Sequence, residues 1–238
     1  LIAATDGMRA YAARAYGPTT ARWYTKPACV DVLRFAEQEV KRPDKLRELG
    51  LEGRIVGLYA GKLGGIYLDQ EVFDLFRAAR DHWGENFRVL LLTPHPVSEL
   101  EPMMARAGLD RSIFTVRSVP HEEVPGLMGL ADFAVTPVKP VPSKRYCTPV
   151  KDGEYWALGL PVIITRDISD DSGIIREHGI GSVLESLDRP GYEKAVKEVA
   201  ALLDGASRKE LYQRIRQIAL RYRSSDRAER IYQEIYGE

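Results

Sequence analysis

The sequence contains only two cysteines, Cys29 and Cys147, in 238 residues. Two cysteines are too few for the disulfide framework of a small secreted domain, so we expect a reducing, cytoplasmic setting. The chain also has no excess of charge of either sign, because 34 lysines and arginines are matched by 34 aspartates and glutamates. Nucleic-acid-binding domains are usually basic, and we therefore expect no nucleic acid among the partners.

Long apolar runs are missing as well. Stretches such as Val89 to Leu92 are far shorter than the roughly 20 apolar residues of a transmembrane helix. Hydrophobic residues make up 45% of the chain and charged residues 29%, which is typical of a globular protein with a sizeable core. The sequence therefore predicts neither a membrane span nor a disordered chain.

Short apolar runs alternate with helical patterns through the middle of the chain, which is typical of a parallel sheet covered by helices on both faces. Strands are predicted at 54–60, 87–93, 113–119, 133–138, 161–165 and 182–185. Three helices are predicted after the last strand, at 192–204, 208–222 and 227–236. We therefore predict the α/β class, with a doubly wound, Rossmann-like parallel sheet.

Several residues indicate where helices begin and end. Asp69 and Gly84 fit the two ends of one helix, and Asp171 or Ser172 opens another that Gly179 ends. Capping-box pairs predict three more helix starts, at Ser98 with Glu101, Ser207 with Glu210, and Asp226 with Glu229. The many basic residues of 208–230 are interpreted as the solvated face of a helical pair.

The loop after the first predicted strand reads Gly61-Lys62-Leu63-Gly64-Gly65. Ligands of open parallel sheets bind at the carboxyl ends of the strands, and a glycine-rich turn with a lysine favours phosphate. The spacing is neither the dinucleotide fingerprint G-x-G-x-x-G nor a P-loop. By itself the pattern fits a purely structural turn equally well.

A second candidate is the stretch TPVKDGEYWALGLPVIIT, from Thr148 to Thr165. Lys151 and Glu154 lie one helical turn apart and share a face. The N-terminus of this predicted helix suits a diphosphate, and a carboxylate one turn further on can accept both hydroxyls of a ribose. On spacing alone, an exposed ion pair between Lys151 and Glu154 is the simpler interpretation.

This stretch resembles the nucleotide-sugar-binding signature of retaining GT-B glycosyltransferases of the large group 1 family. Members often read S-P-x-K-x-x-E-Y-x-A-x-G-x-P-V-V. The matching residues here are Thr148, Pro149, Lys151, Glu154, Tyr155, Ala157, Gly159, Pro161 and Val162. The segments YTKPACVDVLRF, YAGKLGG and GIIREHGIGSVLE resemble, in order, the interdomain linker, the glycine loop, and the helix and strand after the donor loop. The resemblance covers essentially the whole chain.

The resemblance implies four parts in this chain. They are a remnant of the N-terminal, acceptor-side domain (1–26), an interdomain linker (27–50), a Rossmann-like donor-binding domain (51–206) and C-terminal helices (207–238). It implies retaining, hexosyltransferase-type transfer from a nucleotide-diphosphate sugar, as in polysaccharide biosynthesis. A missing N-terminal domain would bind the acceptor, a sugar, lipid or other molecule, and would provide any peripheral membrane association. The chain alone is expected to be inactive, with no cofactor and no required metal.

Carried over residue by residue, the resemblance implies a nucleotide-sugar site but assigns no catalytic residue and no metal ligand. Glu154 would hold the ribose hydroxyls, and Lys62 would reach the diphosphate. The remaining site residues are the loop glycines Gly61, Gly64 and Gly65, the helix start at Thr148, Pro149, Val150 and Lys151, and Val119 in the base-contacting loop. Arg117, where a glycine is common in the family, is interpreted as a substitute charge.

Two positions depart from the family pattern. Tyr146 stands where many members have a glutamate that contacts the transferred sugar, and Tyr67 stands where many have a second phosphate-binding lysine. These departures leave two alternatives open. One is a nucleotide-sugar 2-epimerase of the same fold, and the other is a non-catalytic nucleotide-sugar-binding module.

Overall fold

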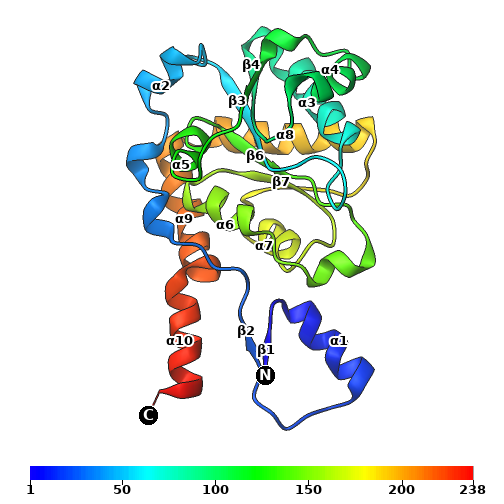
Figure 1. Cartoon of the computed structure of the whole chain (residues 1–238), viewed down its shortest axis with the longest axis vertical. Helices are drawn as coiled ribbons and strands as arrows, with labels where there is room; N and C mark the ends of the chain where they lie inside the picture. The colour runs from blue at the N-terminus through cyan, green and yellow to red at the C-terminus, as the bar shows by residue number, and fades with distance from the viewer. Residues whose placement is uncertain (238) are drawn as a thin grey trace.

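The structure, a computed structural model, describes residues 1–237 and is built around one six-stranded parallel sheet (Figure 1). The order of its strands is β5-β4-β3-β6-β7-β8. Their bounds are Ile55–Ala60 (β3), Phe87–Leu92 (β4), Phe114–Arg117 (β5), Phe133–Thr136 (β6), Val162–Thr165 (β7) and Gly181–Leu184 (β8). The chain starts this sheet in the middle, at β3, and crosses to its other half at β6. This is the Rossmann order, so the predicted doubly wound α/β fold is confirmed, with strand ends shifted by one or two residues.

Helices cover both faces of the sheet, and side chains of one strand alternate between the two cores. In β4, Phe87, Val89 and Leu91 belong to one core while Leu90 and Leu92 belong to the other. The first core contains α3 (Gln70–Trp83), α4 (Val97–Arg106) and α8 (Arg189–Gly205). The second contains α5 (Val124–Met128), α6 (Val150–Ala157), α7 (Asp171–His178) and α9 (Arg208–Arg223). The short helices are α2 (Pro43–Glu48), η1 (Val32–Arg34), η2 (Glu37–Glu39), η3 (Gly84–Asn86), η4 (Arg111–Ile113) and η5 (Pro142–Tyr146).

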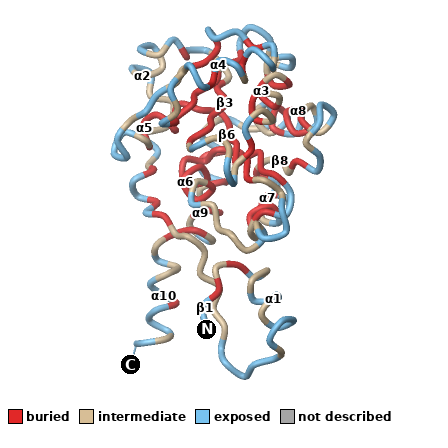
Figure 2. The backbone as a smooth tube through the Cα atoms, turned by 45° about the vertical axis from the view of Figure 1, so that its right-hand side comes forward, coloured by how far each residue is buried: buried red, intermediate tan, exposed pale blue. Residues whose placement is uncertain are grey.

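The two ends of the chain lie side by side below the sheet (Figure 1). Strands β1 (Ile2–Ala3) and β2 (Tyr24–Thr25) pair in parallel and flank α1 (Asp6–Tyr16), next to α10 (Ser225–Tyr236). Figure 2 shows α1 and α10 as mostly unburied, and only Ile231 of α10 is buried. Arg22 joins the two ends through an ion pair with Glu234 at 2.8 Å. Among residues 1–237, no helix has both the length and the apolar character needed to cross a membrane.

The segment between β2 and β3 contributes to the second core. Val30, Val32 and Phe35 are buried there, so these three side chains of the expected linker (27–50) belong to the core. They are buried because α9 returns to them at the end of the chain. The backbone N–H of Val30 donates to the carbonyl of Arg223 at 2.7 Å.

The helix-end predictions are confirmed in part. Asp69 caps α3, and Ser207 forms a complete capping box with Glu210 at the start of α9. The box predicted at Ser98 is wrong, because the N-cap of α4 is Pro96, two residues earlier. The box predicted at Asp226 is also wrong. The N-cap of α10 is Ser224, whose hydroxyl donates to Leu220 O instead.

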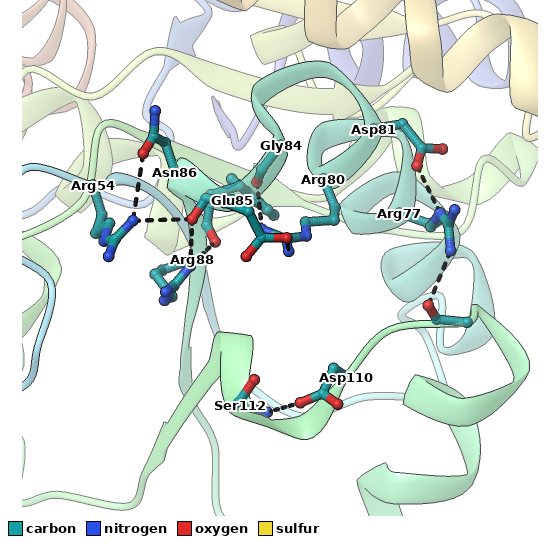
Figure 3. Close-up of polar contacts among 12 residues, drawn as sticks. Arg54, Arg77, Arg80, Asp81, Gly84, Glu85, Asn86, Arg88, Asp110 and Ser112 are labelled. Atoms are coloured by element: carbon teal, nitrogen blue, oxygen red, sulfur yellow. Dashed lines mark hydrogen bonds and ion pairs between the residues drawn. The ribbon is translucent and has the colours of Figure 1, made fainter.

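An arginine cluster fastens the amino ends of β3 and β4 (Figure 3). Arg54 and Arg88 both donate to the carbonyl of Glu85, at 3.0 and 2.9 Å. Arg80 forms an ion pair with the Glu85 carboxylate. Burial, together with the positive charges of Arg54 and Arg80, lowers the pKa of Arg88. This cluster lies at the amino ends of the strands, opposite to the carboxyl ends where ligands of such folds bind.

Helices α6 and α9 approach each other closely at Gly159. This glycine follows α6 with φ +66°, and a Cβ there would lie 2.2 Å from Tyr212 Cα. We expect Gly159→Ala to lower the free energy of unfolding by more than about 2 kcal/mol, because the left-handed backbone is strained and Tyr212 Cα is a backbone atom. Urea denaturation measures this loss.

The matched control is Gly173→Ala in α7, where a Cβ would meet no atom within 4 Å. Alanine should be neutral there or stabilise by up to about 1 kcal/mol. Equal effects of the two substitutions would contradict the close approach at Gly159.

Candidate functional site

The strand order reverses between β3 and β6, and the loops that follow these strands are joined. Leu68 N donates to Pro137 O at 2.8 Å, and Lys139 N donates to Ile66 O at 3.0 Å. In open α/β sheets the crevice for ligands opens at this reversal, outside the carboxyl ends of the strands. The first predicted loop, 61–65, begins at this edge.

The glycine loop has a backbone that side chains would strain. Gly64 and Gly65 have φ of +74° and +64°. Tyr59 holds the loop from the sheet side by donating its hydroxyl hydrogen to Lys62 O. The Lys62 side chain is exposed, and its ammonium makes no hydrogen bond or ion pair within the described chain. The loop is therefore shaped and held by the protein while its cation is free.

His95 supports the same loop, a contact that the sequence did not reveal. Its Nε2 accepts the backbone N–H of Leu63 at 3.2 Å, and its Nδ1 lies 2.9 Å from Glu99 Oε2. A neutral imidazole with its proton on Nδ1 satisfies both contacts. Its position in the sequence could have indicated this contact. His95 is the third residue after β4 and therefore lies, like the glycine loop, at the carboxyl ends of the strands.

Helix α6 begins at this edge and is anchored to β3. The hydroxyl of Tyr155, which is buried, accepts the backbone N–H of Ala60 at 3.1 Å. The N-cap of α6 is Pro149, which provides no side-chain cap. The first N–H groups of α6 therefore lack the partner that most helices provide. Trp156 of the same helix is fully buried in the core.

Lys151 and Glu154 form the predicted one-turn pair, with Nζ and Oε2 2.6 Å apart. The interpretation as an exposed ion pair is wrong, because the Glu154 side chain is only 7% exposed. A buried carboxylate needs hydrogen-bond donors. Lys151 supplies one at Oε2, and no residue of 1–237 supplies one at Oε1.

Thr148 turns its hydroxyl toward the linker segment rather than the crevice. Its Oγ1 accepts from Ala28 N at 2.9 Å and from Arg223 Nη1 at 2.5 Å. Arg223 also pairs with Asp171 at 2.5 Å, and both are buried. The interpretation of 208–230 as a solvated basic face is therefore wrong for Arg223, and Asp171 pairs with this arginine rather than capping α7.

A second buried carboxyl, Asp152, lies in the first turn of α6. It accepts the hydroxyl hydrogen of Thr136, and its Oδ2 has no partner within hydrogen-bonding distance. Burial, together with the negative charge of Asp171, raises the pKa of Asp152 well above its usual range. The neutral form is favoured, and it places no full negative charge beside the helix N-terminus.

The remaining predicted residues lie further out. Arg117 is exposed on the edge strand β5, and its guanidinium donates within the described chain only to Val116 O. Val119 packs partly buried against the second core. Tyr67 pairs with Val138 in the joined loops. Tyr146 packs against Tyr11 of α1 with the two rings tilted by 50° and their centroids 5.4 Å apart.

A cavity of about 700 Å³ lies between α1, α7 and the junction of α9 with α10, and none of the predicted site residues lines it. Asp171 and Arg223, which form the buried ion pair near the start of α6, are among the residues that line this cavity. Elsewhere in residues 1–237, no three histidine, cysteine, aspartate or glutamate side chains gather as metal ligands would. The candidate site rests instead on the glycine loop and the start of α6 at the carboxyl ends of the strands, and it is separate from this cavity.

No protein-family model matches this sequence, and no curated protein is recognisably similar to it. Its structure is similar to those of GT-B glycosyltransferases. WaaG, a glycosyltransferase involved in lipopolysaccharide biosynthesis, gives a TM-score of 0.72 at 17% identity, over 100% of this chain and 63% of WaaG. A glycosyltransferase from Rickettsia africae gives 0.76 at 15% identity, over 99% of this chain and 62% of that one.

HepE from Anabaena, solved with UDP-glucose, gives a TM-score of 0.74 at 14% identity, over 100% of this chain and 63% of HepE. The chain thus spans less than two thirds of each of these structures. At such low identity the likeness shows the fold. That fold is the α/β, Rossmann-like fold which the sequence resemblance implied, and it matches the C-terminal half of GT-B glycosyltransferases.

The raised pKa of Asp152 predicts a pH dependence of stability. Because the folded-state pKa is raised above the unfolded value of about 4, there is a pH range above 4 in which the carboxyl is protonated in the folded chain and ionised in the unfolded chain. Unfolding then releases a proton, so the free energy of unfolding falls as pH rises, by up to about 1.4 kcal/mol per pH unit. Asp152→Asn removes this proton, and its urea-denaturation midpoint should depend less on pH between 5 and 8.

Asp171→Asn is the comparison, because it leaves the buried Arg223 without a counter-ion. We expect it to lose about 3 kcal/mol or more at neutral pH. If Asp152→Asn and the parent had the same pH slope, the protonated state assigned to Asp152 would be incorrect.

Proposed function

We propose that this chain is the donor-binding part of a retaining GT-B glycosyltransferase that binds a nucleotide-diphosphate sugar. One observation carries the proposal. The glycine loop with the free Lys62 ammonium and the uncapped start of α6 with the buried Glu154 both lie at the reversal of the strand order. The glycine loop, the Lys62 ammonium and the start of α6 suit phosphate, whereas the Glu154 carboxylate suits a ribose.

Glu154 is proposed as the ribose anchor. Its Oε2 is fixed by Lys151 at 2.6 Å, which leaves Oε1 to accept a sugar hydroxyl. Because the carboxylate is largely withdrawn from water, a charge-assisted hydrogen bond from a ribose hydroxyl would be stronger there than on the surface.

Lys62 and the start of α6 are proposed to hold the diphosphate. In sugar transfer the nucleoside diphosphate leaves with increasing negative charge, and fixed positive groups stabilise that charge. The ammonium and the free N–H groups of the helix provide them without a divalent ion. A protonated Asp152 in the same turn adds no repulsion.

The solved structures support transfer over epimerisation, since those described above are glycosyltransferases and HepE was solved with UDP-glucose. We propose retention of configuration, and a role in polysaccharide biosynthesis, from the resemblance of 148–162 to the group 1 signature. Val119 is proposed to lie toward the base, Arg117 to supply a substitute charge, and Tyr146 to lie toward the transferred sugar.

Binding measurements on two variants test the assigned roles. Calorimetry with UDP, GDP and ADP, and with their nucleosides, should find one base that binds. Glu154→Gln should weaken that nucleoside and its diphosphate alike, by about 1.5–3 kcal/mol. Lys62→Ala should weaken only the diphosphate, and this loss should shrink as salt rises.

Lys197→Ala is the matched control, because Lys197 is exposed on α8, away from the crevice. It should leave both affinities unchanged. Equal losses of nucleoside and diphosphate in Lys62→Ala would refute the phosphate role, and a folded parent that binds none of the three diphosphates would refute the proposed function.

The proposal also predicts that this chain alone transfers no sugar. We propose that the acceptor binds a domain that corresponds to the remaining part of the similar glycosyltransferase structures, which this chain does not match. A radiolabelled-sugar transfer assay with the purified chain should therefore give only background. Turnover above background would show that the chain carries its own acceptor site.

A further inference from the structure

Three arginines of α9 reach the ends of α6. Arg208 donates to Leu158 O and Gly159 O at 2.7 and 2.8 Å, and Arg216 donates to Ala157 O at 2.7 Å. These carbonyls lie at the C-terminal end of α6, where a helix has unpaired acceptors and its dipole attracts cations. Both arginines therefore stabilise α6 itself.

Arg223 is different because it reaches the opposite end of α6. Its Nη2 donates to Pro149 O, the N-cap carbonyl, at 2.7 Å. A cation at a helix N-terminus is disfavoured by the dipole, and the side chain is fully buried. Replacing a buried ion pair by apolar residues is often neutral or stabilising, so helix stability does not account for this arginine.

What Arg223 does is join three segments that are distant in the sequence. Besides Pro149, its guanidinium donates to Ala28 O at 2.9 Å in the linker segment and to Asp171 Oδ2 at 2.5 Å at the start of α7. It also donates to Thr148 Oγ1, which in turn accepts from Ala28 N. The segment before α6 is thereby bonded to the linker from both sides.

We infer that Arg223 is a positioning residue, which fixes the first turn of α6 relative to the linker and so holds its N–H groups in place for a diphosphate. The order of the turn follows from the hydrogen bonds alone, whereas the diphosphate rests on the proposed function. The residue does not touch the crevice, and it acts through Thr148 and Pro149.

Arg223→Lys tests this role. Lysine keeps a positive charge for Asp171 but lacks the planar fork that reaches Ala28, Thr148 and Pro149 together. Arg216→Lys is the matched control, since Arg216 lies on the same helix and also bonds both α6 and the linker, at Ala157 O, Phe35 O and Val32 O. Both variants replace three or more hydrogen bonds by one flexible ammonium.

Two readouts separate positioning from plain stability. Amide hydrogen exchange of the ligand-free chain should accelerate about tenfold at 153–154, the first amides that donate within α6, in Arg223→Lys and remain at the parental rate there in Arg216→Lys. Calorimetry with UDP and uridine, and with the matching guanosine and adenosine pairs, should show about tenfold weaker diphosphate binding in Arg223→Lys with nucleoside binding within about twofold of the parent.

Equal acceleration at 153–154 in both variants, or an unchanged ratio of diphosphate to nucleoside affinity in Arg223→Lys, overturns the inference. If the parent binds no diphosphate, the proposed function fails, and the exchange rates alone decide whether Arg223 orders the turn. If Arg223→Lys does not fold, Thr148→Val decides. That variant removes the hydroxyl shared by Arg223 and Ala28 and should accelerate exchange at the same turn.

Discussion

The close packing of α9 along α6 is the constraint on which the rest of the structure depends. At Gly159 the two backbones approach so closely that no side chain fits. From this contact the arginines of α9 reach both ends of α6, and the apolar face of α9 covers the second core. The position of the α6 N-terminus is therefore determined by a helix that begins about fifty residues after α6 ends.

Much of the fold could be predicted from the sequence because its signals are local. A strand buried on both faces is apolar almost throughout, as in β4, and a capping box such as Ser207 with Glu210 lies within one turn. The failures were also local in origin. The N-cap of α4 is Pro96 rather than Ser98, and the N-cap of α10 is Ser224 rather than Asp226. In both cases a helix start was predicted correctly but two residues too late.

The candidate site was predictable only where its residues follow a strand or share a helical turn. The Lys151–Glu154 pair and the glycine loop meet this condition. The Arg223–Asp171 pair spans 52 residues, and the contact between Leu63 and His95 spans 32. Neither has a pattern in the sequence, since each depends on how two elements are placed by the core. Arg223 was interpreted as solvated because it lies among many basic residues. It is buried because it belongs to the face of α9 that packs against the core.

The ring contact between Tyr146 and Tyr11 has a consequence for protein engineering. Tyr146 belongs to the loop before α6, whereas Tyr11 belongs to α1, in the part of the chain outside the six-stranded sheet. A loop transplanted from one of the similar GT-B structures would arrive without its partner ring and would face a helix fitted to a different neighbour. Exchange of this loop therefore requires that the loop and α1 be moved together.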